Sequence, residues 1–274
     1  NKGLEITIKS RNIDHPDFSW HTTFNFSTNR NTIVHLYGDM QDITDSTGKV
    51  IGQQEASDIT NKWFIGHSID AVWDAKVTGV YQTDQADEAA KFGKKPGDFI
   101  VQDVNGDHKI TNTDRQFLGY SKPRFRWTLN NDFTIYKNFD LSVSVYSYWG
   151  YMSSFNQAKN NASFPDRVNS YIYPYWTPEH PENKFSRIYS SDGGASYSVY
   201  RNRNFIRLDN IALGYTFPQA LLSRAKIQAL KVYFTVKNVA FYAPDWIYWD
   251  PDWDPDTGPG PTPRTYTLGL NLTL

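Results

Sequence analysis

The sequence predicts an all-β fold, namely the last seven strands of a transmembrane, antiparallel up-and-down β-barrel. Apolar and polar residues alternate along seven separate runs, which is the period of a strand with two different faces. Short and long connections alternate between these runs, as the periplasmic turns and external loops of outer-membrane barrels do. Aromatic residues make up 16% of the chain, an excess that suits the aromatic girdles of such barrels.

The first four expected strands lie at residues 3–13, 18–31, 123–135 and 138–150. The first of them shows the alternation, because Leu4, Ile6 and Ile8 stand between polar neighbours. The connection at 14–17 is short, the one at 32–122 is long, and Tyr136 and Lys137 form a two-residue connection. A tight hairpin is therefore expected at each of the two short connections.

The last three expected strands lie at residues 203–217, 229–240 and 264–274. The final one alternates without interruption, with an apolar side chain at every second position: Tyr266, Leu268, Leu270, Leu272 and Leu274. The residues between them are small and uncharged, including Thr267, Gly269 and Asn271. We expect the apolar set to face lipid and the small polar set to face a solvated barrel interior, although a water-soluble β-sandwich could show the same alternation.

The connections also predict a topology. In an up-and-down sheet every second connection lies at the same end, so the long segments 32–122, 151–202 and 241–263 should share one side. If the tight turns are periplasmic, this side is extracellular. Bacterial single-chain barrels have even strand numbers of at least eight, so we expect further strands before Asn1.

Composition excludes several other classes of protein. The chain has no cysteine, which removes disulfides, thiolate metal sites and a cysteine nucleophile. Its net charge of −1 leaves no basic face for nucleic acid. It has no uninterrupted apolar run near the length of a transmembrane helix. Because it also lacks a phosphate-binding loop and a nucleophile elbow, we do not expect an enzyme.

One local motif predicts a calcium site. Oxygen ligands stand at the spacing of an EF-hand-like loop: Asp103, Asn105, Asp107, the backbone carbonyl of Lys109, Thr111 and Asp114. Ca²⁺ takes six to eight oxygen ligands, and this short arc offers them without closing a long loop. His108 stands where the loop needs the positive φ that glycine provides, at a cost on the order of 1 kcal/mol. The alternative is a metal-free turn held by side-chain hydrogen bonds.

The segment from Tyr242 to Pro263 is rich in tryptophan and aspartate. Trp246, Trp249 and Trp253 alternate with carboxylates, which could stack on and hydrogen-bond to sugars. The alternative, which we favour, is a proline-stiffened external loop whose aromatic side chains pack on neighbours or on a protein partner. Other aromatic residues are candidates for the membrane girdle: Trp63, Trp73, Tyr148, Trp149, Tyr151 and Trp176.

Several motifs, in order along the chain, resemble the C-terminal half of the SusC-like (SusC/RagA) TonB-dependent transporters. They are Gly3-Leu4-Glu5-Ile6, Gly97-Asp98-Phe99, Asp103-Val104-Asn105-Gly106-Asp107, Tyr136-Lys137-Asn138-Phe139-Asp140-Leu141, Tyr175-Trp176-Thr177-Pro178-Glu179, Phe205-Ile206-Arg207-Leu208-Asp209-Asn210, Lys237-Asn238-Val239 and Pro263-Arg264-Thr265-Tyr266. The resemblance covers nearly the whole chain. Two positions depart from the family pattern, since Leu274 replaces a terminal aromatic residue and His108 replaces a glycine.

The resemblance implies a 22-strand barrel in the outer membrane of a Gram-negative bacterium, with a plug domain and the earlier strands expected before Asn1. Such a transporter imports glycan oligosaccharides or peptides, draws energy from TonB through its N-terminal region, and is capped by a SusD-like surface lipoprotein. The same barrel could instead be a structural or assembly component of a larger outer-membrane complex. A third and weaker alternative is a soluble carbohydrate-binding β-protein, which would extract without detergent.

Overall fold

The computed structural model describes residues 1–159, 174–247, 250–252 and 262–274. The chain divides into two compact units. The sheet unit consists of residues 1–30, 123–151 and 203–274, and the loop unit consists of residues 31–122 and 152–202. Within the described ranges, no helix has the length and apolar character needed to cross a membrane.

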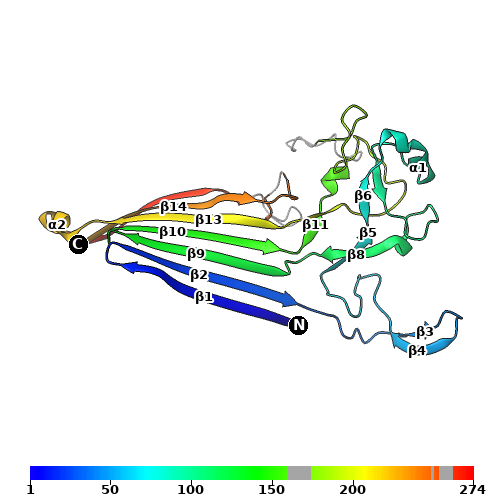
Figure 1. The fold of residues 1–274 in the computed structure, drawn as a ribbon, viewed down its shortest axis with the longest axis horizontal. Helices are drawn as coiled ribbons and strands as arrows, with labels where there is room; N and C mark the ends of the chain where they lie inside the picture. Colours follow the sequence, from blue (N-terminus) through cyan, green and yellow to red (C-terminus); the bar gives the residue numbers. More distant parts are fainter. Residues whose placement is uncertain (160–173, 248–249, 253–261) are drawn as a thin grey trace. The chain divides into compact units, whose positions relative to one another are not determined.

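The sheet unit is built on one seven-stranded antiparallel sheet in the order β1-β2-β9-β10-β13-β14-β15 (Figure 1). Its strands are β1 (Lys2–His15), β2 (Phe18–Arg30), β9 (Phe125–Ile135), β10 (Phe139–Trp149), β13 (Phe205–Thr216), β14 (Ala229–Tyr242) and β15 (Thr265–Thr273). Each strand coincides with one of the seven ranges expected from the sequence to within about two residues at either end. Strands that are neighbours in the sheet are consecutive along the sheet unit, so the topology is up-and-down.

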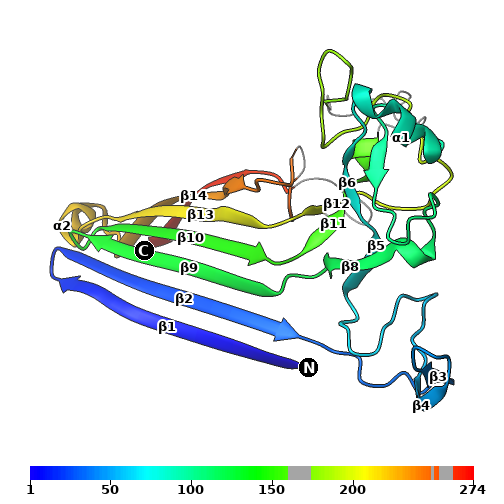
Figure 2. The same ribbon diagram turned by 45° about the vertical axis from the view of Figure 1, so that its right-hand side comes forward.

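Tight connections gather at one end of this sheet. Pro16 and Asp17 join β1 to β2, and Tyr136 to Asn138 join β9 to β10. Tyr136 and Lys137 have φ values of 48° and 62°, the left-handed conformation that a tight hairpin needs. The third connection contains α2 (Gln219–Leu222) and a 3-10 turn, η4 (Ser223–Ala225). The long segments leave from the opposite strand ends (Figure 2).

The strand register sorts apolar and polar side chains onto opposite faces. One row of paired residues crosses five strands as Phe133, Leu141, Leu213, Phe234 and Leu268. The next row along the same strands is Asp132, Ser142, Ala212, Thr235 and Thr267. Because successive residues of a strand point to opposite faces, these two rows lie on the two sides of the sheet. We call them the apolar face and the polar face.

A β-bulge at Asp209 inverts this alternation within β13. Asn210 pairs with Ser144 and Leu208 pairs with Val145, so Asp209 has no partner on β10. The extra residue shifts the phase, so that Arg207 pairs with Tyr146 on the polar face. Without the bulge, Arg207 would share the apolar face with Ile211. The bulge therefore keeps a charged side chain off the apolar face.

The described residues of the loop unit form four two-stranded sheets, each antiparallel. Its elements are β3 (Met40–Thr44), β4 (Val50–Glu55), β5 (Ala71–Ala75), β6 (Val77–Val80), the 3-10 turn η1 (Thr83–Gln85), α1 (Ala86–Lys91), β7 (Phe99–Val101), η2 (Asn112–Asp114), β8 (Arg115–Tyr120), β11 (Met152–Ser154), η3 (Asn156–Lys159) and β12 (Tyr200–Asn202). Its core includes Val80, Phe99, Phe155 and Phe185, each at most 2% exposed. Much of the expected long loops is thus folded and has a core of its own.

Candidate functional site

The apolar face carries aromatic side chains toward both strand ends. Near the tight turns, Trp20 stacks on Phe133 with ring centroids 5.8 Å apart, and Phe139 packs on Tyr215 at 4.5 Å. On β10, the apolar face runs from Phe139 at one end to Trp149 at the other, with Leu141, Val143, Val145 and a buried serine, Ser147, between them. That interval is about 33 Å along a strand, or about 25 Å at the tilt of about 40° that barrel strands adopt. It matches the height of the lipid-facing band of outer-membrane barrels.

The polar face is linked by side-chain hydrogen bonds across its strands. The Asn25 side chain accepts from Thr7 at 2.9 Å and donates to Thr128 at 2.9 Å, which connects β1, β2 and β9. Lys231 on β14 forms an ion pair with Asp140 on β10 at 2.6 Å, over the intervening strand. It passes above Gly214, where a Cβ would lie 2.7 Å from the Lys231 Cε. Polar groups that bond one another in this way suit a hydrated interior.

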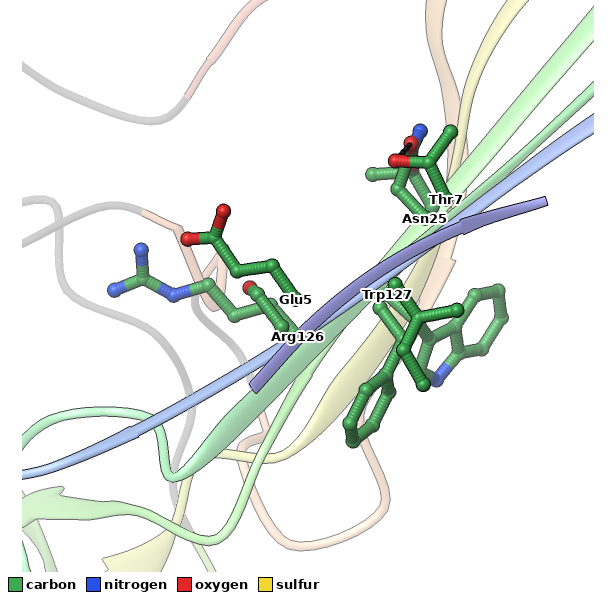
Figure 3. Close-up of a pocket in the computed structure, with 9 residues that line it drawn as sticks. Glu5, Thr7, Asn25, Arg126 and Trp127 are labelled. Atoms are coloured by element: carbon green, nitrogen blue, oxygen red, sulfur yellow. Dashed lines mark hydrogen bonds between the residues drawn. The ribbon is translucent and has the colours of Figure 1, made fainter. Parts of the chain in front are cut away.

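A shallow hollow of about 210 Å³ lies beside β1, which is an edge strand of the described sheet. Figure 3 shows Glu5, Arg126, Thr7 and Asn25 on one side of the strands and Trp127 on the other. The hollow therefore collects side chains from both faces of the sheet. It marks the two-sided character of this edge and does not by itself define a binding site.

The polar face also holds an ionic cluster at the strand ends opposite the tight turns. Arg207 is 2% exposed and forms an ion pair with Asp250, while its Nε lies 3.1 Å from an Asp252 carboxylate oxygen. The Tyr146 hydroxyl donates to the same Asp252 carboxylate. Arg203 donates to the backbone carbonyl of Pro251 at 2.7 Å. These contacts fasten residues 250–252 to the polar face of the sheet.

The tryptophan and aspartate segment therefore behaves as a packed loop where the structure describes it. Trp246 is 3% exposed. The Arg203 guanidinium lies over its ring, 5.0 Å from the ring centroid. Asp250 is 7% exposed and binds Arg207, so neither side chain presents a free sugar-stacking surface. Trp249 and Trp253 lie outside the described residues. Sequence reasoning left Arg207 out of any site, because an arginine in a barrel interior is unremarkable by itself.

The aromatic residues considered for the girdle divide between the units. Trp149 is on the apolar face, whereas Tyr148 pairs with Arg126 and lies on the polar face. Trp176 belongs to the loop unit and is 6% exposed, within hydrogen-bond distance of Gln82. Trp63 and Trp73 are also in the loop unit. Trp63, Trp73 and Trp176 are therefore not part of the seven-stranded sheet, and the prediction that they lie on its apolar face is wrong.

The acidic loop, residues Asp103 to Asp114, folds as a tight turn, which both the calcium site and the metal-free alternative require. Asp103 accepts from the backbone N–H of Gly106 at 2.7 Å and from that of His108 at 2.8 Å. His108 has a φ of 59°, the strained conformation expected at that position. Asp107 accepts from the Lys109 N–H, and Asn105 donates to both Asp107 and Thr113.

Asp114 closes this loop from a fully buried position. Its two oxygens accept from the backbone N–H groups of Val104 at 2.9 Å and Thr111 at 2.8 Å. Burial alone would raise the pKa of this carboxyl, but the backbone donors outweigh it and the pKa is lowered. Among the described residues, no three acidic or histidine side chains converge as a metal site. Calcium would therefore need the oxygens of Asn105, Thr111 and Lys109, and it stays a prediction.

The loop unit contains buried charges that sequence reasoning missed. Asp98 is fully buried and forms an ion pair with Arg187 at 2.9 Å. Lys159, 7% exposed, forms an ion pair with Asp192 at 2.9 Å and donates to the Tyr197 carbonyl. Lys94 is 4% exposed. Lysine is almost never fully buried without a partner, and no local pattern in the sequence sets these lysines apart from surface ones.

The chain was compared with known sequences and solved structures. No protein-family model matches the chain. The chain is 28% identical to TonB-dependent receptor P3 of Formosa agariphila, over 99% of this chain and 28% of that receptor. It is 27% identical to TonB-dependent receptor SusC of Bacteroides thetaiotaomicron, over 99% of this chain and 26% of the receptor. A solved structure of the RagAB peptide transporter superposes with a TM-score of 0.63 at 16% identity, covering 98% of this chain and 29% of the transporter chain.

The fold is thus that of an antiparallel β-barrel wall, like that of the RagAB peptide transporter. More particularly, the curated homologues are TonB-dependent receptors, SusC among them, and the SusC-like resemblance of the sequence is confirmed. The chain spans between 26% and 29% of the length of these proteins. The relatives are named as receptors and transporters, which accords with the expectation that this chain is not an enzyme.

Proposed function

We propose that this chain forms the C-terminal part of the barrel of a TonB-dependent importer in the outer membrane of a Gram-negative bacterium. The observation that carries the proposal is the two-faced sheet. Its apolar face has aromatic side chains at both ends of an aliphatic band, and its polar face is a network of hydrogen bonds and ion pairs. Lipid on one side and water on the other satisfy both faces.

We further propose that the imported solutes are glycan oligosaccharides or peptides, delivered with a SusD-like lipoprotein. The names of the relatives support this proposal, since one is SusC and others are structures of a peptide importer. The tight turns would lie in the periplasm, and the loop unit and the segment after β14 would lie outside the cell. An external loop unit with its own core offers a firm surface to a lipoprotein lid.

The proposed function is tested by uptake in cells that lack the intact receptor. We expect the deletion to abolish growth on one oligosaccharide or peptide mixture, and the wild-type gene to restore it. A strain that lacks TonB should fail in the same way while it still assembles the barrel. If the assembled barrel changes the uptake of no solute and TonB is dispensable, the barrel is a structural component instead. Outer-membrane fractionation of each strain supplies the control.

A further inference from the structure

The loop unit contains a cavity of about 430 Å³, a size typical of small-molecule sites. Three short segments of this unit form its walls. They are the end of α1 with the residues after it (Lys91 to Lys94), the second half of the acidic loop (His108 to Ile110) and the turn from Asp192 to Ala195. Nothing in the proposed transport mechanism uses this cavity, and it lies wholly within one unit.

The cavity walls are rich in positive charge. Lys91, Lys94 and Lys109 line it, and Lys91 is paired with Glu88 at 2.6 Å, outside the lining. Among the described lining residues, the one carboxylate is that of Asp192. This carboxylate is already engaged by the Lys159 ammonium at 2.9 Å. Lys109 is exposed, and within the described part of the chain no carboxylate oxygen lies within 4.0 Å of its ammonium. The walls therefore carry cationic groups in excess of their internal partners.

Lys94 is the most demanding of these groups. Its ammonium is buried and donates to the Phe99 carbonyl at 2.8 Å, and it lies 4.9 Å from the centroid of the Tyr197 ring. Among the residues described, it has no carboxylate within ion-pair distance. Burial lowers its pKa to about 8, although Asp192 and Asp98 act in the opposite direction. An anion in the cavity would supply the counter-charge that Lys94 lacks.

The turn opposite the lysines is shaped for close approach. Gly193 and Gly194 have φ values of 65° and 81°, which glycine adopts without strain. A Cβ on Gly193 would lie 2.3 Å from the carbonyl oxygen of Phe92, so only glycine lets the turn reach the end of α1. The contact between Gly193 and Phe92 joins two walls of the cavity that are about a hundred residues apart in sequence.

We propose that this cavity binds an oxyanion carried by a solute of about monosaccharide size. Lysine ammonium groups act as point charges and bind carboxylate, sulfate and phosphate alike. The feature that these ligands share is the oxyanion. The neutral part of the solute fills the remaining volume against Phe92 and Ile110. The proposed site differs from the calcium site of the acidic loop, because an oxyanion would take the ammonium of Lys109 whereas calcium would take only its backbone carbonyl.

Titration calorimetry on the intact protein in detergent tests the proposal, at a fixed calcium concentration. The probes are glucuronate, its neutral counterpart glucose, and inorganic phosphate. We expect glucuronate to bind, phosphate to compete with it, and glucose to give no signal. Lys109→Met should weaken glucuronate binding about tenfold, the loss of one charge-assisted contact. Asp192→Asn should strengthen it, because it removes the one carboxylate among the described lining residues and leaves the Lys159 ammonium without that partner.

The matched control is Lys95→Met, which removes the same charge from an exposed neighbour that does not line the cavity. Unchanged affinity in this variant supports a defined site, whereas an equal loss in Lys95→Met and Lys109→Met would show non-specific attraction and overturn it. Equal binding of glucose and glucuronate, or no binding of either anion, would also overturn it. Binding of phosphate alone that depends on Lys109 would support the site and restrict it to tetrahedral oxyanions.

Discussion

Single residues decide how the segment after β14 is held on the polar face. Arg207 contacts two carboxylates, those of Asp250 and Asp252, from a nearly inaccessible position. Its guanidinium has the planar fork that binds carboxylates from two sides, which a lysine cannot reproduce. The position of Arg207 on this face depends in turn on the bulge at Asp209. One unpaired residue thus fixes where a loop is attached.

Replacement of this arginine should release the loop. Arg207→Ala leaves Asp250 buried without its partner, which typically costs about 3 to 5 kcal/mol. We expect residues near Asp250 to become sensitive to protease while the barrel still assembles. Asp250→Asn combined with Arg207→Ala should recover part of the resistance, because the uncompensated charge is gone. Unaltered protease resistance in Arg207→Ala would show that the ionic cluster does not hold the loop.

The acidic loop gives a second test at the residue scale. If Ca²⁺ binds through Asp103, Asn105, Asp107, the Lys109 carbonyl, Thr111 and Asp114, the distances should be about 2.3 to 2.6 Å. Asp103→Ala should abolish calcium-dependent protection of this loop in hydrogen exchange and leave barrel assembly intact. Asp87→Ala, an exposed aspartate on α1, is the control. A wild-type loop whose protection is the same with calcium and with chelator would identify the metal-free turn.

At the scale of elements, the alternation of apolar and polar residues predicted the strands of the large sheet. It could do so because each strand has one side on the apolar face and the other on the polar face. The bulge at Asp209 was not predicted, although the three-residue spacing of Leu208 and Ile211, both on the apolar face, is its signal. The small strands of the loop unit left no comparable pattern. β7 has three residues, Phe99–Val101, and is held by tertiary burial rather than by alternation. The buried Lys94 of the same unit likewise depends on a residue distant in sequence, because its ammonium lies over the Tyr197 ring.

The final strand tests the assignment of faces. Leu270 pairs with Val232 on the apolar face, and Asn271 pairs with Lys231 on the polar face. Leu270→Arg should cost about 2 to 4 kcal/mol of folding free energy if it lies near the bilayer midplane. Asn271→Arg, one residue further along the strand, should cost much less. Urea titration of the protein in lipid vesicles measures both, and equal costs would contradict the assignment.

At the scale of the whole molecule, the alternation of connections predicts one topology. The segments that follow β2, β10 and β14 all leave the same end of the sheet. On intact cells, a membrane-impermeant label should therefore reach residues within 32–122, 151–202 and 241–263 and spare the turns at Pro16 and Tyr136. Labelling of one long segment from outside and of another only from the periplasm would exclude an up-and-down barrel.

The most direct test of the membrane assignment uses β10, because the chain contains no cysteine of its own. Single cysteines at Leu141, Val143 and Val145, and at Ser142 and Ser144 between them, would carry nitroxide spin labels in the intact protein in lipid vesicles. The first three should be relaxed by oxygen, which concentrates in lipid, and the other two by a water-soluble nickel chelate. Absence of this alternation, or chelate access at the three apolar positions, would contradict a sheet with lipid on one face and water on the other.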